Sequence, residues 1–341
     1  MKLDFVLRLP VTGPLASVES IRSAAETAEV SGWDAVSTHD HIFHDYERRY
    51  HHAGGASELV DVRDKMGLPV TNIYETMTVF SYVAGFTEHV RLISCALVLP
   101  WRHPILLAKQ VITLDHLSGG RFVCHVCLGN ITSDYEAMGV QYNRKGKIID
   151  EYLQILKQLL STGKVTAFQG KYIKVPECQM FPAPINPIPL WYGGSFTPVA
   201  YERVAKYATG FFPRGSPQEY AKGLPQLKEQ LERYGRKLSE IKVGTQLFLC
   251  VGRDGEQARK MAKYTVASFF SGPEWAKDRE RRIKETYDAN LFGTPDDCIK
   301  KLQTYADAGV EIFDIRLIAP GLSDHLQMMK LFAKEVISSY R

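Results

Sequence analysis

The sequence predicts an α/β protein that forms a (β/α)8 TIM barrel. Short runs of β-branched and aromatic residues alternate with longer amphipathic segments, a pattern typical of a parallel sheet covered by helices. There are eight such runs, the number at which a parallel sheet closes into a barrel. A minimal barrel takes about 250 residues, and the chain has 341. We therefore expect a single domain over residues 1–341, enlarged by loop insertions at the C-terminal face.

The expected strands are short and bounded by turn residues. They are Leu3–Leu9, Asp34–Thr38, Val90–Val98, Phe122–Leu128, Ile188–Tyr192, Gly210–Phe212, Thr245–Val251 and Ile312–Ile318.

The expected helices have apolar residues at a spacing of three to four. They are 17–31, 74–88, 104–116, 147–160, 197–208, 217–234, 254–270, 295–308 and 323–338. Ser17, Thr197 and Thr294 are start signals, and Gly32 and Gly309 fit the left-handed position that ends a helix.

Three stretches are longer than a barrel connection requires: 39–73, 129–187 and 271–294. Loops that follow strands build the active site of a barrel, so we expect functional side chains there.

Composition excludes several classes of protein. Hydrophobic residues make up 45% and charged residues 23%, which excludes disorder, and the net charge of +4 is not gathered in a basic block. We expect no nucleic acid partner and no membrane association, and a cytoplasmic location. The six cysteines lie mostly in apolar runs and are expected to be free thiols. Cys124 and Cys127 should point to opposite faces of a strand, so no metal site is expected.

Histidines cluster after the second expected strand, where five of the ten lie between positions 39 and 52. His39 and His41 would point the same way, as in metal-dependent hydrolases, but few histidines remain to complete such a site. A second interpretation makes His41 a cofactor-contacting or proton-transfer residue. A third leaves these histidines as parts of a polar loop.

A glycine-rich turn follows the fifth expected strand. Tyr192-Gly193-Gly194-Ser195 precedes a helix that starts after Thr197. Close backbone N–H groups and a helix N-terminus would form a phosphate cradle, although an ordinary tight turn has the same sequence features.

The chain resembles the bacterial luciferase-like family of flavin- and deazaflavin-dependent oxidoreductases, which are (β/α)8 barrels. The resemblance covers nearly the whole sequence and is strongest in Leu114-Asp115-His116-Leu117-Ser118-Gly119-Gly120-Arg121-Phe122. It also includes Gly32-Trp33-Asp34 running into Asp40-His41, the stretch from Leu99 to Pro104, and Trp191 to Ser195.

The resemblance implies roles for individual residues. Gly193, Gly194 and Ser195 match the turn that holds the cofactor phosphate, with Tyr192 beside it. Cys95-Ala96-Leu97 matches a place where relatives often have a non-prolyl cis peptide under the cofactor ring, although an ordinary core strand is the alternative. His41, with Asp40 beside it, matches a histidine near the reactive edge of the ring. The candidate catalytic residue is therefore His41, and the candidate cofactor-binding residues are Asp40, Ala96, Leu97, Asn130, Tyr192, Gly193, Gly194, Ser195 and Arg214.

One departure affects the choice of cofactor. Many deazaflavin enzymes have a glutamate proton donor after the fourth strand, where this chain has Asn130. An amide can bind a ring edge but cannot deliver a proton. Asn130-Ile131-Thr132-Ser133 also resembles a stretch of FMN-dependent members, which favours reduced FMN. The Asp40-His41 pair and the Leu114–Phe122 stretch resemble the deazaflavin subgroup and keep coenzyme F-420 as the alternative.

The main hypothesis is a two-component monooxygenase that uses reduced FMN and O2 on a small organic substrate. Its expected partners are that small molecule, a separate flavin reductase and a second copy of the chain in a homodimer. In this hypothesis Arg214 reaches the phosphate or an acidic substrate, with a solvated loop charge as the alternative. A deazaflavin-dependent hydride-transfer enzyme and a non-catalytic flavin-binding protein remain as alternatives.

Overall fold

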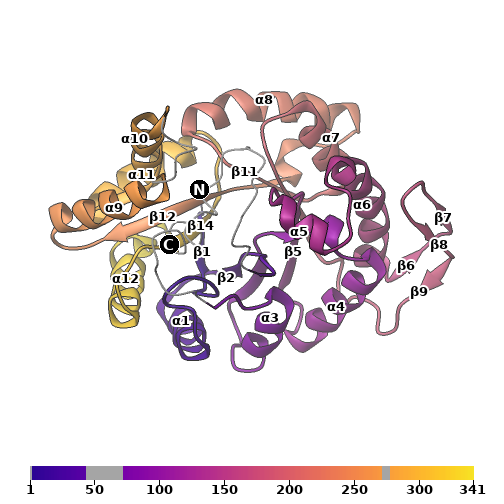
Figure 1. Ribbon diagram of the computed structural model, residues 1–341, viewed down its shortest axis with the longest axis horizontal. Coiled ribbons are helices and arrows are strands. Elements are labelled where there is room, and N and C mark those ends of the chain that lie inside the picture. The colour runs from indigo at the N-terminus through magenta and orange to yellow at the C-terminus, as the bar shows by residue number, and fades with distance from the viewer. Residues whose placement is uncertain (1, 44–71, 271–276) are drawn as a thin grey trace.

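The computed structural model describes residues 2–43, 72–270 and 277–341, and these form a closed parallel barrel inside a ring of helices (Figure 1). The strands around the barrel are β1 (Asp4–Arg8), β2 (Ala35–Thr38), β3 (Arg91–Ser94), β5 (Phe122–Cys127), β10 (Leu190–Gly194), β11 (Gly210–Pro213), β12 (Lys242–Val251) and β14 (Ile312–Leu317). β5 pairs with β10 in parallel, which closes the sheet. The predicted fold class and all eight predicted strands are confirmed.

The expected helices are also present. They are α1 (Val18–Ser31), α3 (Thr76–Ala84), α4 (Pro104–Leu117), α6 (Lys145–Thr162), α7 (Pro198–Tyr207), α8 (Pro217–Arg233), α9 (Gly255–Phe269), α11 (Pro295–Asp307) and α12 (Leu322–Glu335). The predicted helix caps are confirmed. The side chains of Ser17, Thr197 and Thr294 accept hydrogen bonds from backbone N–H groups in the first turn of their helices. Gly32 and Gly309 have φ of 92° and 95°, values that favour glycine.

The insertions contain elements that the sequence did not predict. These are α5 (Thr132–Ala137), two short antiparallel pairs, β6 (Lys164–Val165) with β9 (Cys178–Gln179) and β7 (Phe168–Gln169) with β8 (Lys174–Val175), then α10 (Arg279–Ala289) and β13 (Leu291–Gly293); β4 (Leu97–Val98) lies within the expected strand Val90–Val98. α10 was missed because it buries none of its residues and has no apolar stripe. Ion pairs one turn apart support it, such as Arg281 with Glu285. The expected strand Val90–Val98 is divided into β3 and β4 at Cys95–Ala96.

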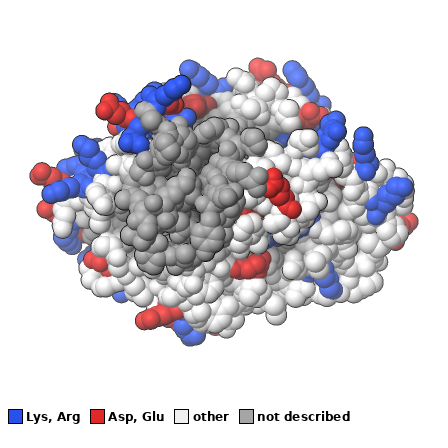
Figure 2. Space-filling model, viewed as in Figure 1, with Lys and Arg blue, Asp and Glu red and all other residues white. Residues whose placement is uncertain are grey.

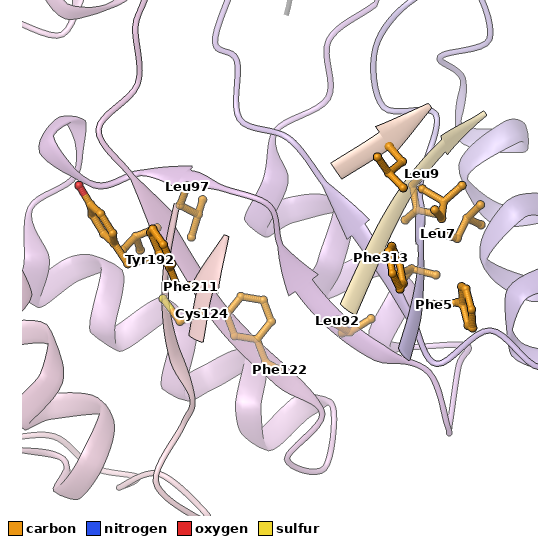
Figure 3. Close-up of a cluster of buried hydrophobic side chains, with 14 of the residues drawn as sticks. Phe5, Leu7, Leu9, Leu92, Leu97, Phe122, Cys124, Tyr192, Phe211 and Phe313 are labelled. Carbon is orange, nitrogen blue, oxygen red and sulfur yellow. The ribbon is translucent and has the colours of Figure 1, made fainter. Parts of the chain in front are cut away.

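Alternate residues of each strand face two different cores. Phe5, Leu7 and Leu9 point from β1 into the layer between strands and helices, together with Phe313 of β14 (Figure 3). Val6 lies instead in the cluster of strand residues formed by Val6, Ala35, Ile93, Cys95, Val123, Trp191, Phe212 and Ile312. Because side chains alternate along a strand, residues two positions beyond this cluster face the C-terminal mouth of the barrel.

The sequence stretch most specific for the resemblance joins elements of the scaffold. The Arg121 guanidinium donates to the carbonyl oxygens of Thr87 (2.7 Å), Val90 (2.8 Å) and Ser118 (2.7 Å). The carboxylate of Asp115 accepts from the backbone N–H of Ile185 at 2.9 Å. Arg121 thus connects the segments that follow α3 and α4 to the start of β3.

All six cysteines are free, as predicted; four are buried, and Cys127 and Cys178 are partly exposed. On the face of the molecule in Figure 2, acidic and basic side chains of both signs are spread around the edge. In the described ranges we find no helix with the length and apolar character needed to cross a membrane.

A buried ion pair lies at the mouth end of the barrel interior. Arg8 of β1 and Asp314 of β14 are 6% and 1% exposed and bond to each other. The Ser37 hydroxyl of β2 donates to the second oxygen of Asp314 at 2.5 Å.

Removing the carboxylate of this pair should destabilise the protein strongly. Asp314→Ala would leave the Arg8 guanidinium buried and unpaired, which costs about 3–5 kcal/mol in such pairs. Urea unfolding followed by circular dichroism measures the change. Asp288→Ala, which removes the carboxylate of an exposed pair with Lys284, is the matched control and should change the unfolding free energy little. Equal effects of the two substitutions would contradict the assignment.

Candidate active site

The mouth of the barrel gathers polar side chains from most strands. Counting two residues beyond the interior apolar positions predicts which side chains point there. The rule gives Arg8, Ser37, Cys95, His125, Gly193, Arg214 and Asp314, and a further step along β2 gives His39. Hydrogen bonds and charge interactions connect most of these residues.

Arg8 connects the buried ion pair to the chain between β3 and β4. Its Nη2 donates to the carbonyl oxygen of Cys95 at 3.0 Å, in addition to its bond with Asp314. The Cys95–Ala96 peptide bond is cis, which confirms the prediction for this stretch. Ala96 is partly exposed, whereas Cys95 and Leu97 on either side of it are buried. Leu97 packs in the layer between strands and helices (Figure 3) and is not brought to the mouth.

Gln246 of β12 reaches the same stretch from the opposite side of the barrel. Its Nε2 donates to the Cys95 thiol at 3.0 Å, and its Oε1 accepts from Arg214 Nη2 at 2.6 Å and from Nε at 3.2 Å. The Arg214 guanidinium is therefore bonded to the same side chain that holds Cys95.

His39 and His41 lie together at the end of β2, with ring centroids 5.1 Å apart. His39 Nε2 shares a hydrogen bond of 2.8 Å with the Thr12 hydroxyl. Burial lowers the pKa of His39 well below its usual value, and His41, Arg316, Arg8 and Arg214 lower it further. His39 is therefore neutral at physiological pH. The other histidines of the predicted cluster, His44, His51 and His52, lie outside the described residues.

The Asp40 side chain turns away from the histidines. Its carboxylate accepts from Arg102 Nη1 at 2.5 Å and Nη2 at 2.8 Å, and from the Val98 backbone N–H at 2.8 Å. These three bonds fasten β4 to the end of β2. The aspartate that accompanies His41 in the sequence thus holds the backbone beside Ala96.

The two glycines at the end of β10 are packed too tightly to carry side chains. A Cβ on Gly193 would lie 2.8 Å from His125 Nε2, and one on Gly194 would lie 2.8 Å from the Tyr192 ring. Tyr192 itself is buried behind the strand, where its hydroxyl accepts from Arg203 Nη1 at 2.9 Å. The structure thus leaves the Gly193-Gly194-Ser195 backbone at the mouth and places the Tyr192 side chain behind it. Asn130 is partly exposed just beyond β5.

Sequence reasoning did not select Arg8 and Gln246 for the site, and it considered His39 only as a metal ligand. The alternation of each strand was a usable signal for Arg8 and His39, since both follow interior apolar residues by an even number of positions. No cluster of three or more His, Cys, Asp or Glu side chains suited to a metal occurs in the described part of the chain.

Buried imidazoles of the barrel should stay neutral over a wide pH range. Burial and the charge on Arg8 lower the pKa of His125 to about 3, and the pKa of His39 is lowered as well. Histidine-selective NMR is expected to show no titration of His125 between pH 7.5 and pH 5, and a midpoint for His39 well below that of an unfolded histidine. In the unfolded protein in urea, both should titrate near pH 6.5. A folded-state midpoint above pH 6 for either residue would contradict the burial argument.

Comparisons with known proteins agree with this architecture. The sequence profile of luciferase-like monooxygenases matches residues 5–311. The chain is 22% identical over 328 residues to an FMNH2-dependent dimethylsulfone monooxygenase of Pseudomonas putida, covering 87% of this chain and 88% of that one. It is 31% identical over 215 residues to the uncharacterized protein Rv0940c of Mycobacterium tuberculosis, covering 62% of this chain and 71% of that protein.

Among solved structures, the coenzyme F-420-dependent tetrahydromethanopterin reductase of Methanopyrus kandleri has a TM-score of 0.74 at 19% identity, with full coverage of both chains. That likeness concerns the fold. Together with the profile match over most of the sequence, it leads to one conclusion: the chain belongs to the luciferase-like monooxygenase family.

Proposed function

We propose that the protein is a monooxygenase that uses reduced FMN and O2 to oxidise a small organic substrate. The observation that carries the proposal is the state of the carboxylates at the mouth. Asp40 is held by Arg102 and Asp314 by Arg8, and Asn130 stands where a deazaflavin enzyme would have its acid. The imidazoles of His39 and His41 remain as candidates for proton transfer in the described part of the mouth. The similarity to an FMNH2-dependent relative over most of both chains supports the same cofactor.

The residues present fit a flavin. The Gly193-Gly194 backbone has no room for side chains, as expected of a turn that approaches a phosphate closely, and Ser195 is exposed beside it. Ala96 is partly exposed beside buried neighbours and can lie against the ring. Reduced flavin, when bound, supplies the electrons that activate O2.

The chain's own residues would then bind, orient and move protons. His41 is the candidate for proton transfer, and Asn130 for orienting the ring edge. Asp40 acts indirectly by holding β4 through Arg102 and Val98. Because Arg214 is bonded to Gln246 of β12, on the side of β11 opposite the Gly193-Gly194 backbone of β10, we assign Arg214 to the substrate rather than to the phosphate. A separate reductase would deliver the reduced flavin.

The alternative is hydride transfer with deazaflavin coenzyme F-420, as in the Methanopyrus kandleri reductase. Anaerobic titration of the apoprotein with reduced FMN and with reduced F-420, followed by air, distinguishes the two. The proposal predicts tighter binding of reduced FMN and a transient absorbance change on aeration. Preference for F-420 without any reaction with O2 would establish the alternative. A flavin that stays bound and never turns over would indicate a binding protein.

Replacing His41 tests its part in the reaction. In His41→Ala the rate of turnover should fall at least tenfold while FMN affinity changes less, because a general acid or base contributes about 10²–10⁴-fold. The control is His89→Ala. It removes an exposed histidine that lies just before the start of β3 and bonds to Glu29. Stopped-flow kinetics and flavin fluorescence measure the two quantities separately. An unchanged rate would remove His41 from the mechanism.

A further inference from the structure

Lys145 is a partly buried cation without a carboxylate partner among the described residues. Three arginines with little exposure near the barrel mouth and α7 are each paired with a carboxylate: Arg8 with Asp314, Arg102 with Asp40 and Arg203 with Asp150. Lys145 Nζ instead donates to the Gly129 carbonyl at 2.9 Å and lies 3.7 Å from the centre of the Tyr142 ring. A charge removed from water in a protein is ordinarily paired with an opposite charge, so the Lys145 ammonium is suited to binding an anion.

Lys145 contacts the segment that follows the strand next to the glycine turn. Its contact, Gly129, follows β5 by two residues, and Cys127 at the end of β5 is in register with Gly193 of β10. Adjacent strands are about 4.8 Å apart, so Gly129, whose carbonyl holds the Lys145 ammonium, follows the strand that neighbours the glycine turn. Arg203 of α7 donates to the Gly146 carbonyl at 2.8 Å and so fixes the start of α6 against the helix that the turn leads into.

The electrostatic state of Lys145 agrees with an anion site. Burial lowers the pKa of its ammonium group to about 8, and in the described part of the chain only Cys127 opposes this effect. A bound phosphate would raise that pKa again, because an opposite charge favours the ammonium form. Lys147, two residues along the same helix, is exposed and does not share this environment.

We propose that Lys145 binds the phosphate group of the cofactor, as the cationic partner of the Gly193-Gly194-Ser195 turn. The inference rests on the proposed function for the identity of the phosphate compound. The phosphate chemistry itself is common to FMN and to the deazaflavin. Three donors on a compact ammonium suit a phosphate oxygen as a point charge.

The experiment compares reduced FMN with reduced riboflavin, which lacks the phosphate, in anaerobic titrations of the apoprotein followed by tryptophan fluorescence. In Lys145→Gln the affinity for FMN should fall about tenfold or more while riboflavin affinity stays unchanged. Lys145→Arg should restore most of the FMN affinity, and Lys147→Gln should behave like the wild type. Wild-type FMN affinity should also weaken from pH 7 to pH 9, as the free lysine loses its proton, and should not weaken in Lys145→Arg.

Equal losses for FMN and riboflavin would show that Lys145 only supports Gly129, and would overturn the inference. Inorganic phosphate gives a readout that needs no flavin: it should raise the pKa of Lys145, followed by NMR of the lysine side chain. An unchanged pKa at saturating phosphate would also overturn the proposal. If the wild type binds neither reduced FMN nor reduced riboflavin, the proposed function fails, and F-420 and the deazaflavin without its phosphate-bearing side chain then provide the same comparison for Lys145.

Discussion

The arrangement of the barrel mouth depends on the ion pair and the hydrogen bonds that the Arg8 guanidinium makes. Arg8 stands on β1, pairs with Asp314 of β14 and, through that carboxylate, connects to Ser37 of β2. Its remaining bond goes to the Cys95 carbonyl at the end of β3. A buried charge of this kind is tolerated only with its partners in place. The backbone that would face a cofactor ring is thus fixed by the same bonds that satisfy the ion pair.

Gln246 of β12 bonds to the same Cys95 from the opposite side of the barrel. A neutral amide has a donor and an acceptor, so one side chain holds the Cys95 thiol and orients Arg214 at the same time. A carboxylate at this position would offer no donor to Cys95. The network therefore passes from β1 and β14 through Cys95 to β12 and the end of β11, and groups on opposite walls are positioned together.

The sequence was sufficient for the barrel because each strand keeps a simple alternation and each helix an apolar stripe. It was insufficient where that regularity is absent. α10 has charges on all sides, and the short antiparallel pairs after α6 contain too few residues for a period to be recognised. Candidate site residues could be named from the sequence where a local motif exists, as at Asp40-His41 and Gly193-Gly194-Ser195, and their roles stay predictions. Lys145 could not have been found this way, because being unpaired is a property of the folded neighbourhood and not of any local pattern.

The stretch from Leu114 to Phe122 is the part of the sequence most specific for the family, but it carries little information about the reaction. Arg121 and Asp115 bond to backbone groups in the segments that follow α3 and α4 and in the segment before β10, so their pattern is required by the scaffold whichever cofactor is bound. These scaffold contacts do not distinguish a chain that activates O2 from one that transfers hydride. Since burial and neighbouring cations keep His39 neutral, a proton placed on it would be readily given up. With His41 only 5.1 Å away, a charge on one ring disfavours a charge on the other. The pair can therefore hold one proton more easily than two, which suits a site that moves single protons without a carboxylic acid.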